Sequence, residues 1–225
     1  METEHALNRP IQVMIYAPIV GRGGVRRLVE RLLGTWMQQA DPERWRFQVL
    51  SQPYDEIGKP IDWGAAHFIP LKADAPLPTS TVDVFHYLRR NQDDFLQQLK
   101  QHAEQTDVVW MPQPWWTLRV ASEIIDLPAH LVPTVHDFAF DHLHWNDAFG
   151  DAYRHEVSVM VKACSKLVFS SQYTLEHAAS RYSMPHERGE VIYLGDFLPE
   201  TFMPTPTEAE RVRAAHNLPA SYFLA

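Results

Sequence analysis

The sequence has only one cysteine, Cys164, in 225 residues and therefore forms no disulfide within the chain. Disulfides form in oxidising compartments, so a lone cysteine favours a reducing one. Residues 1–9 are polar and lack the apolar core of a signal peptide. We therefore expect a cytoplasmic protein.

Long hydrophobic runs and an excess of positive charge are also missing. No run approaches the roughly 20 apolar residues needed to cross a bilayer, so any membrane contact is expected to be peripheral. The 20 Lys and Arg residues against 28 Asp and Glu residues give a formal net charge of -8. Proteins that bind nucleic acids neutralise phosphates with an excess of basic residues, so we expect no nucleic-acid partner.

The chain does have a regular alternation of short apolar runs with helical patterns. Residues 11–17 are typical of a strand buried on both faces, and the apolar positions that follow recur every three or four residues, as on one helix face. Residues 81–103 predict another helix, with an irregularity near Asn91. Further strands are expected at 45–50, 65–69, 107–111, 131–135, 166–170 and 190–194. This alternation predicts an α/β fold with a doubly wound, mostly parallel, Rossmann-like sheet, in which ligands bind at the carboxyl ends of the strands.

Glycine is scarce, with nine residues in all, yet Gly21, Gly23 and Gly24 lie together after the first predicted strand. Such glycines let backbone N–H groups approach a phosphate at the start of the next helix, although they serve a tight turn equally well. A dinucleotide-binding motif would have a third glycine near position 26, which is Arg26 here, and no P-loop follows. We therefore expect an anion-binding loop of another type.

Basic residues cluster at the start of the helix that follows this loop. Cations there oppose the helix dipole, and a bound phosphate or anionic lipid head would relieve the conflict. The alternative is a solvated face without a ligand. The residues concerned are Arg22, Arg26, Arg27 and Arg31.

His136 and Asp137 follow a predicted buried strand, where a side chain projects toward the ligand-binding edge of the sheet. Histidine is suited to hydrogen bonding and proton transfer near neutral pH. Asp141, His142 and His144 follow closely, and His-x-His beside carboxylates is also compatible with a metal site. A metal-dependent hydrolase that uses His136 with these three residues is therefore an alternative.

Trp115 and Trp116 follow the predicted strand at 107–111. Exposed indoles form flat apolar platforms that suit the faces of sugars, whereas buried indoles fill a core. Both interpretations remain open for this pair.

Four segments, taken in order, resemble the N-terminal domain of glycosyltransferase family 4, which comprises retaining enzymes of the GT-B fold. Gly21-Arg-Gly-Gly-Val-Arg-Arg-Leu is similar to the family's glycine loop and first helix, and Pro133-Thr-Val-His-Asp to its strand that ends in His-Asp. Cys164-Ser-Lys-Leu-Val-Phe-Ser-Ser resembles the next strand, and Glu190-Val-Ile-Tyr-Leu-Gly the strand and turn that close the domain. The closing turn departs from the family's usual Asn-Gly-Val-Asp, so a role for Gly195 does not carry over.

The resemblance implies a transferase of polysaccharide biosynthesis that moves a sugar from a nucleotide-sugar donor to a saccharide, lipid-linked or small-molecule acceptor. It implies that His136 lies against the transferred sugar as a catalytic residue, with Asp137 beside it. Arg22, Gly23 and Gly24 would contact the donor diphosphate, and no metal or other cofactor is required. The loops with Trp115, Trp116, His142 and His144 would contact the acceptor.

The resemblance also implies a domain organisation. Residues 1–198 would form the Rossmann-like acceptor-side domain, and residues 199–225 a linker and the start of a C-terminal donor-binding domain. Since a GT-B site lies between two domains, this chain alone is expected to transfer no sugar. A noncatalytic binding fragment is the remaining alternative.

Overall fold

The computed structural model describes residues 9–18, 24–53, 61–73, 81–112, 123–124, 126–142, 148–193 and 205–217. The chain divides into two compact units, Met1–Leu194 and Gly195–Ala225. The predicted domain boundary between residues 198 and 199 falls outside the described residues. In the second unit the described element is helix α7 (Pro206–Ala215), which begins with a capping box of Thr205 and Glu208.

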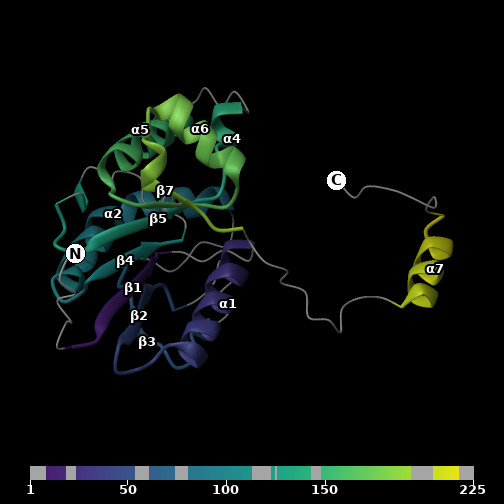
Figure 1. The fold of residues 1–225 in the computed structure, drawn as a ribbon, viewed down its shortest axis with the longest axis horizontal. Helices are drawn as coiled ribbons and strands as arrows, with labels where there is room; N and C mark the ends of the chain where they lie inside the picture. Colours follow the sequence, from purple (N-terminus) through teal and green to yellow (C-terminus); the bar gives the residue numbers. More distant parts are fainter. Residues whose placement is uncertain are drawn as a thin grey trace. The chain divides into compact units, whose positions relative to one another are not determined.

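The first unit is built on a parallel sheet, which confirms the predicted fold class. Within the described residues the sheet has seven strands in the order β3-β2-β1-β4-β5-β6-β7 (Figure 1). All neighbouring strands pair in parallel. The strands are β1 (Ile11–Ala17), β2 (Trp45–Ser51), β3 (His67–Pro70), β4 (Val108–Met111), β5 (His130–Val135), β6 (Leu167–Phe169) and β7 (Gly189–Val191).

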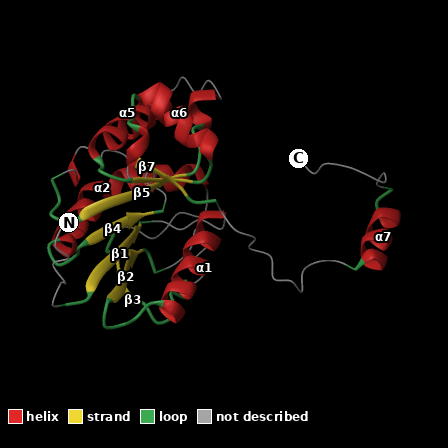
Figure 2. Cartoon of the chain, in the orientation of Figure 1, coloured by secondary structure: helices red, strands yellow, loops and turns green. Residues whose placement is uncertain are grey.

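Helices lie on both faces of this sheet (Figure 2). They are α1 (Gly24–Gln39), α2 (Thr81–Ala103), α4 (Ala139–His142), α5 (Ala148–Ala163), α6 (Gln172–Tyr182) and the 3-10 turn η2 (His186–Arg188). The expected irregularity near Asn91 is wrong: α2 is continuous, and the buried Asn91 amide donates to the carbonyl of Tyr87 one turn earlier. None of the described helices is long and apolar enough to cross a membrane.

Successive strand residues supply two separate cores because their side chains alternate between the faces of the sheet. Met14 and Val109 join the core formed with α2, α5 and α6, whereas Ile15 and Trp110 join the core formed with α1. Trp36 of α1 anchors this second core, with ring centroids 5.5 Å from Phe47 and 5.2 Å from Trp110.

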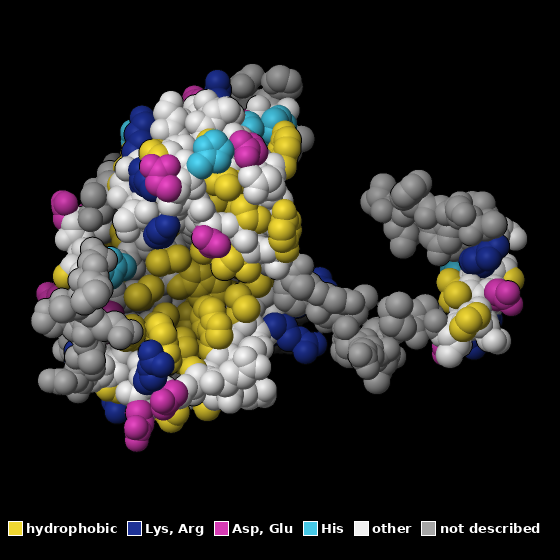
Figure 3. Space-filling model, viewed as in Figure 1, with side chains coloured by type: hydrophobic (Ala, Val, Ile, Leu, Met, Phe, Trp, Pro, Cys, Tyr) yellow, Lys and Arg dark blue, Asp and Glu magenta, His cyan; other side chains and the backbone are white. Residues whose placement is uncertain are grey.

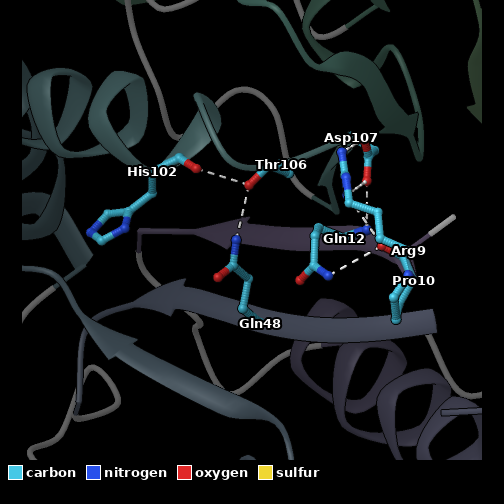
Figure 4. A network of polar contacts seen from close by, with 7 residues as sticks. All are labelled: Arg9, Pro10, Gln12, Gln48, His102, Thr106 and Asp107. Carbon is cyan, nitrogen blue, oxygen red and sulfur yellow. Dashed lines mark hydrogen bonds and ion pairs between the residues drawn. The ribbon is translucent and has the colours of Figure 1, made fainter. Parts of the chain in front are cut away.

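A polar network ties the chain together around the amino ends of β1 and β4 (Figure 4). Both terminal guanidinium nitrogens of Arg9 donate to the carboxylate of Asp107, at 2.7 and 2.8 Å. The backbone N–H of Gln12 donates to the same carboxylate at 2.8 Å. Thr106 connects the end of α2 to β2, since its hydroxyl donates to His102 O and accepts from the Gln48 amide. The network holds the amino ends of β1 and β4 together and ties the end of α2 to β2.

We expect Asp107→Asn to lower the free energy of unfolding by about 1 kcal/mol at pH 7, because a partly exposed ion pair and a charge-assisted hydrogen bond are weakened. The hydrogen bond from Arg9 holds the pKa of Asp107 below its ordinary value of 3.8. Because the pKa of Asp107 is lower in the folded than in the unfolded protein, its ionised carboxylate stabilises the fold at pH values above the unfolded pKa. This contribution to stability is lost as the pH falls through the folded pKa. Urea unfolding at pH 7 and at pH 2 to 3 should therefore show a smaller difference between the two proteins in acid, whereas an equal difference at both pH values would contradict the assignment.

Candidate functional site

His136 follows β5 directly, at the carboxyl edge of the sheet where a doubly wound fold binds ligands. Its ring is partly buried, and Nε2 lies 2.8 Å from the carbonyl oxygen of Pro112, which follows β4. A carbonyl oxygen only accepts, so Nε2 carries the proton and donates. In the neutral ring Nδ1 is then left as a hydrogen-bond acceptor.

Burial lowers the pKa of His136 below its ordinary value of 6.5, against the opposing effects of the Pro112 hydrogen bond and the Asp137 charge. The imidazole is therefore neutral at pH 7. A neutral ring with one nitrogen fixed by the backbone can accept a hydrogen bond from a substrate hydroxyl.

We expect the ring of His136 to titrate with a midpoint below 6.5, measured by two-dimensional NMR of the imidazole resonances in residues 1–225. The ring should keep the Nε2–H tautomer, because Pro112 O accepts from that nitrogen. A midpoint for His136 above 6.5 would contradict the burial argument.

The backbone of His136 is held by the next strand and helix. The Ser170 hydroxyl, after β6, donates to His136 O at 2.6 Å, and Thr174 of α6 approaches the same oxygen at 3.4 Å. Ser171 is the N-cap of α6 and accepts from the Thr174 N–H. Ser170 stands at the end of the strand predicted at 166–170, whereas no sequence signal pointed to Thr174. The end of β5 is thus clamped by β6 and α6.

Asp137 is exposed and lies two residues before the short helix α4. Its Oδ1 accepts from the N–H of Ala139 at 2.9 Å, which is a typical turn made by an aspartate with its own backbone. Its charge also acts on the neighbouring ring by raising the pKa of His136. The charge of Asp137 therefore influences the protonation of His136 at the site.

Asp141 and His142 lie on α4 and contact helix α6. Asp141 Oδ2 accepts from His177 Nε2 and from the Tyr182 hydroxyl, each at 2.9 Å. His142 Nε2 lies 3.4 Å from the hydroxyl of Tyr173. Asp141 thus links α4 to α6 by hydrogen bonds. Within the part of the chain that is described, no group of three His, Cys, Asp or Glu side chains is arranged to hold a metal ion.

The glycine loop is described only from Gly24, which is the first residue of α1 and follows β1 by a short connection. Arg26, in the first turn of α1, pairs with Glu30 at 2.7 Å. Several predicted site residues lie outside the described residues: Arg22, Gly23, Trp115, Trp116 and His144.

Comparison with known proteins gives a match in structure but not in sequence. No protein-family model matches the chain, and a search of curated proteins found no match. Sucrose-phosphate synthase from Thermosynechococcus elongatus superposes with a TM-score of 0.61 at 16% identity, over 94% of this chain and 53% of that one. HepE from Anabaena, solved with UDP and glucose, superposes with a TM-score of 0.57 at 16% identity, over 92% of this chain and 50% of that one.

The first unit has the fold of one domain of the GT-B glycosyltransferases. The lipopolysaccharide outer core galactosyltransferase WaaB also matches, with a TM-score of 0.50 at 12% identity, over 83% of this chain and 46% of that one. The chain spans about half the length of these solved structures. At such identities the likeness establishes the fold alone, and the chemistry has to be argued from the residues.

Proposed function

We propose that this chain is the N-terminal half of a two-domain glycosyltransferase of the family 4 type, which transfers a sugar from a nucleotide-sugar to an acceptor with retention of configuration. The observation that carries the proposal is the neutral His136 at the carboxyl edge of a GT-B sheet. The glycine loop follows β1, which is separated from β5 by β4 alone, so the strands β1 and β5 lie about 10 Å apart across the sheet. HepE, which shares this fold, is solved with UDP-glucose, and that distance suits a diphosphate joined to a sugar.

In this proposal the donor diphosphate binds at the start of α1. Backbone N–H groups of Gly23 and Gly24 would point at the phosphates, with the helix dipole and Arg22 adding positive potential. Departure of the nucleoside diphosphate leaves negative charge on its terminal phosphate, and fixed donors aimed at that charge stabilise the transition state. The scheme uses no metal and no other cofactor.

His136 would lie against the transferred sugar, with its unprotonated Nδ1 accepting from a sugar hydroxyl. The Pro112 carbonyl fixes the orientation of the imidazole ring, and Ser170 fixes the backbone of His136. Nδ1 is therefore in place to accept a hydrogen bond before the substrate binds. Asp137 would tune the ring or contact the acceptor.

The acceptor would be a saccharide, a lipid-linked saccharide or a small molecule, bound by the loops that follow β4 and β5. Trp115 and Trp116 would offer apolar platforms for sugar faces, and His142 and His144 polar contacts. We place the enzyme in polysaccharide biosynthesis in the cytoplasm, with at most peripheral membrane contact. Residues 1–225 alone would transfer no sugar, since positioning donor against acceptor between two domains contributes about 7–11 kcal/mol to lowering the barrier.

The test is a transfer assay on the full polypeptide encoded by the gene, with a panel of nucleotide-sugars and saccharide acceptors and detection of the product by mass spectrometry. Residues 1–225 are assayed alongside, together with a thermal melt. The expected result is transfer by the full polypeptide that persists in EDTA, and a cooperative melt without transfer for residues 1–225. Equal turnover by the two proteins, or hydrolysis abolished by EDTA, would overturn the proposal.

A further inference from the structure

An exposed tyrosine stands near His136 at the carboxyl edge of the sheet, where doubly wound folds bind their ligands. Tyr173 lies in the first turn of α6, and 67% of it is exposed. The hydroxyl of its neighbour Thr174 lies 3.4 Å from His136 O. Since successive Cα atoms are about 3.8 Å apart, the backbone of Tyr173 lies within about 10 Å of His136. One bound molecule can therefore reach both residues.

The ring of Tyr173 is flanked by two histidines. The Tyr173 hydroxyl lies 3.4 Å from His142 Nε2, and the centroid of its ring lies 6.4 Å from those of His142 and His177. The two imidazole rings meet edge to face, with centroids 5.0 Å apart. Figure 3 shows histidine and hydrophobic side chains side by side over α4. A surface of aromatic and imidazole rings therefore joins α4 to the start of α6.

Beneath this surface the ring of His177 is held from two sides. It stacks on the buried Phe138 with centroids 4.7 Å apart, and its Nε2 lies 2.9 Å from Asp141 Oδ2. The same carboxylate oxygen accepts from the Tyr182 hydroxyl. The side chain of Asp141 is only 5% exposed, and its Oδ1 is buried without a hydrogen-bond partner in the described part of the chain.

The position of Asp141 is unfavourable for stability alone. A buried carboxylate oxygen without a partner costs free energy, and well-packed apolar side chains often stabilise a fold as well as a buried ion pair does. Exceptions of this kind are expected at functional sites. We therefore interpret the Asp141–His177 pair by what it does to the surface above it, which is to fix the His177 ring beside Tyr173.

The chemistry of this surface suits a sugar ring. A pyranose has an apolar C–H face that packs on an exposed aromatic ring, and a rim of hydroxyls that needs hydrogen-bonding groups at the edge of that ring. Tyr173 supplies the aromatic ring, and His142 and His177 supply imidazole nitrogens beside it. The carboxylate of Asp141 adds negative charge, which disfavours a phosphate or another anionic group here.

We propose that Tyr173, His142 and His177 form a subsite for one sugar ring of the acceptor. This inference rests on the proposed function and narrows the acceptor to an oligosaccharide. One of its rings packs on Tyr173, while the hydroxyl that receives the transferred sugar lies near His136. Asp141 is a positioning residue, because it acts on the ligand only through His177.

The first test measures the binding of saccharides to residues 1–225 in the absence of donor. The labelled protein is applied to an array of mono- to hexasaccharides of defined structure, and the Kd of the strongest ligand is then measured by calorimetry. Tyr173→Ala removes the ring, whereas Tyr173→Phe keeps the ring and removes the hydroxyl. Tyr193→Ala is the matched control, because Tyr193 is 70% exposed but follows β7, outside α4 and α6.

We expect the native protein to bind saccharides of two or more residues, and Tyr173→Ala to raise the Kd by about three- to ten-fold. Tyr173→Phe and Tyr193→Ala should stay within about two-fold of the native Kd, since neither removes the ring from the subsite. Binding of no saccharide would overturn the inference, as would an unchanged Kd for Tyr173→Ala. An equal loss in Tyr173→Phe would overturn it too, because the hydroxyl rather than the ring would then make the contact.

The second test measures steady-state kinetics of the full polypeptide encoded by the gene. Tyr173→Ala should raise KM for the acceptor by the same factor and leave kcat and the donor KM unchanged, because the subsite contacts the acceptor equally before and during the reaction. Transfer with an unchanged acceptor KM would overturn the subsite and leave the proposed function standing. Saccharide binding through Tyr173 without any transfer would support the subsite and overturn the proposed function.

Discussion

Changing His136 to Ala is expected to lower the turnover of the full polypeptide by about a hundred-fold or more, with little change in the binding of the donor. The physical reason is that Nδ1 of a neutral, preorientated imidazole would meet the transferred sugar, and groups positioned in this way contribute about 10²–10⁴-fold. The diphosphate contacts at the start of α1 would remain, so the loss should fall on kcat rather than on KM for the donor.

His130→Ala is the matched control, because His130 starts the same strand at the opposite, amino edge of the sheet and is exposed. It should leave kcat within about two-fold of the native value, since substitutions away from buried features are close to neutral. Steady-state kinetics with thermal melts of both variants check the prediction. A folded His136→Ala protein with native kcat would remove His136 from the site, while retained activity with a lowered melting temperature would assign it a structural role.

Changing Gly189 to Ala is expected to lower the free energy of unfolding by about 1–3 kcal/mol, because the position has no room for a side chain. A Cβ on Gly189 would lie 2.2 Å from Leu175 Cδ1 and 3.1 Å from both Met184 Cε and Phe169 Cε2. These three side chains are buried in the core that β7 shares with α6, so relief of the overlap requires the core to shift. Since a loss of 1 kcal/mol lowers Tm by roughly 2–4 °C in a chain of this size, the effect is measurable by calorimetry.

Gly34→Ala is the matched control, since Gly34 lies within α1 and nothing lies within 4 Å of an added Cβ. Replacing glycine by alanine inside an exposed helix stabilises it by about 0.5–1 kcal/mol. The two substitutions are chemically identical and should shift Tm in opposite directions. Shifts of the same sign would show that packing at Gly189 does not control the stability of this edge of the sheet.

The predicted fold class was confirmed because it depends on apolar runs and on the spacing of apolar residues, and these local patterns match the strands and helices of the structure. The run at residues 11–17 and the helix at 81–103 coincide with β1 and α2. The strands predicted at 65–69 and 190–194 are shifted in the structure to His67–Pro70 and Gly189–Val191. Apolar runs mark burial, whereas the ends of a strand are set by its pairing partner, such as Gln48 opposite His67.

Helix α4 was missed because four residues are too few to show a helical period. The predicted grouping of His136, Asp141 and His142 used their closeness in sequence, but their partners come from distant elements. His136 bonds to Pro112, and Asp141 bonds to His177 and Tyr182. Sequence spacing carries no information on these partners, since it does not say which side chains of β4 or α6 face the end of β5.

The sequence by itself determined the alternation of strands and helices, and hence a doubly wound sheet with His136 at its carboxyl edge, because burial and periodicity are properties of neighbouring residues. Only the tertiary structure decided which nitrogen of His136 carries the proton, since that depends on the carbonyl that β4 brings to within 2.8 Å. Only the tertiary structure revealed that the apolar second face of β5 and β6 has no described helix over it. Which helix covers which strand follows from the order of the strands, and that order is set by long-range packing rather than by the local pattern.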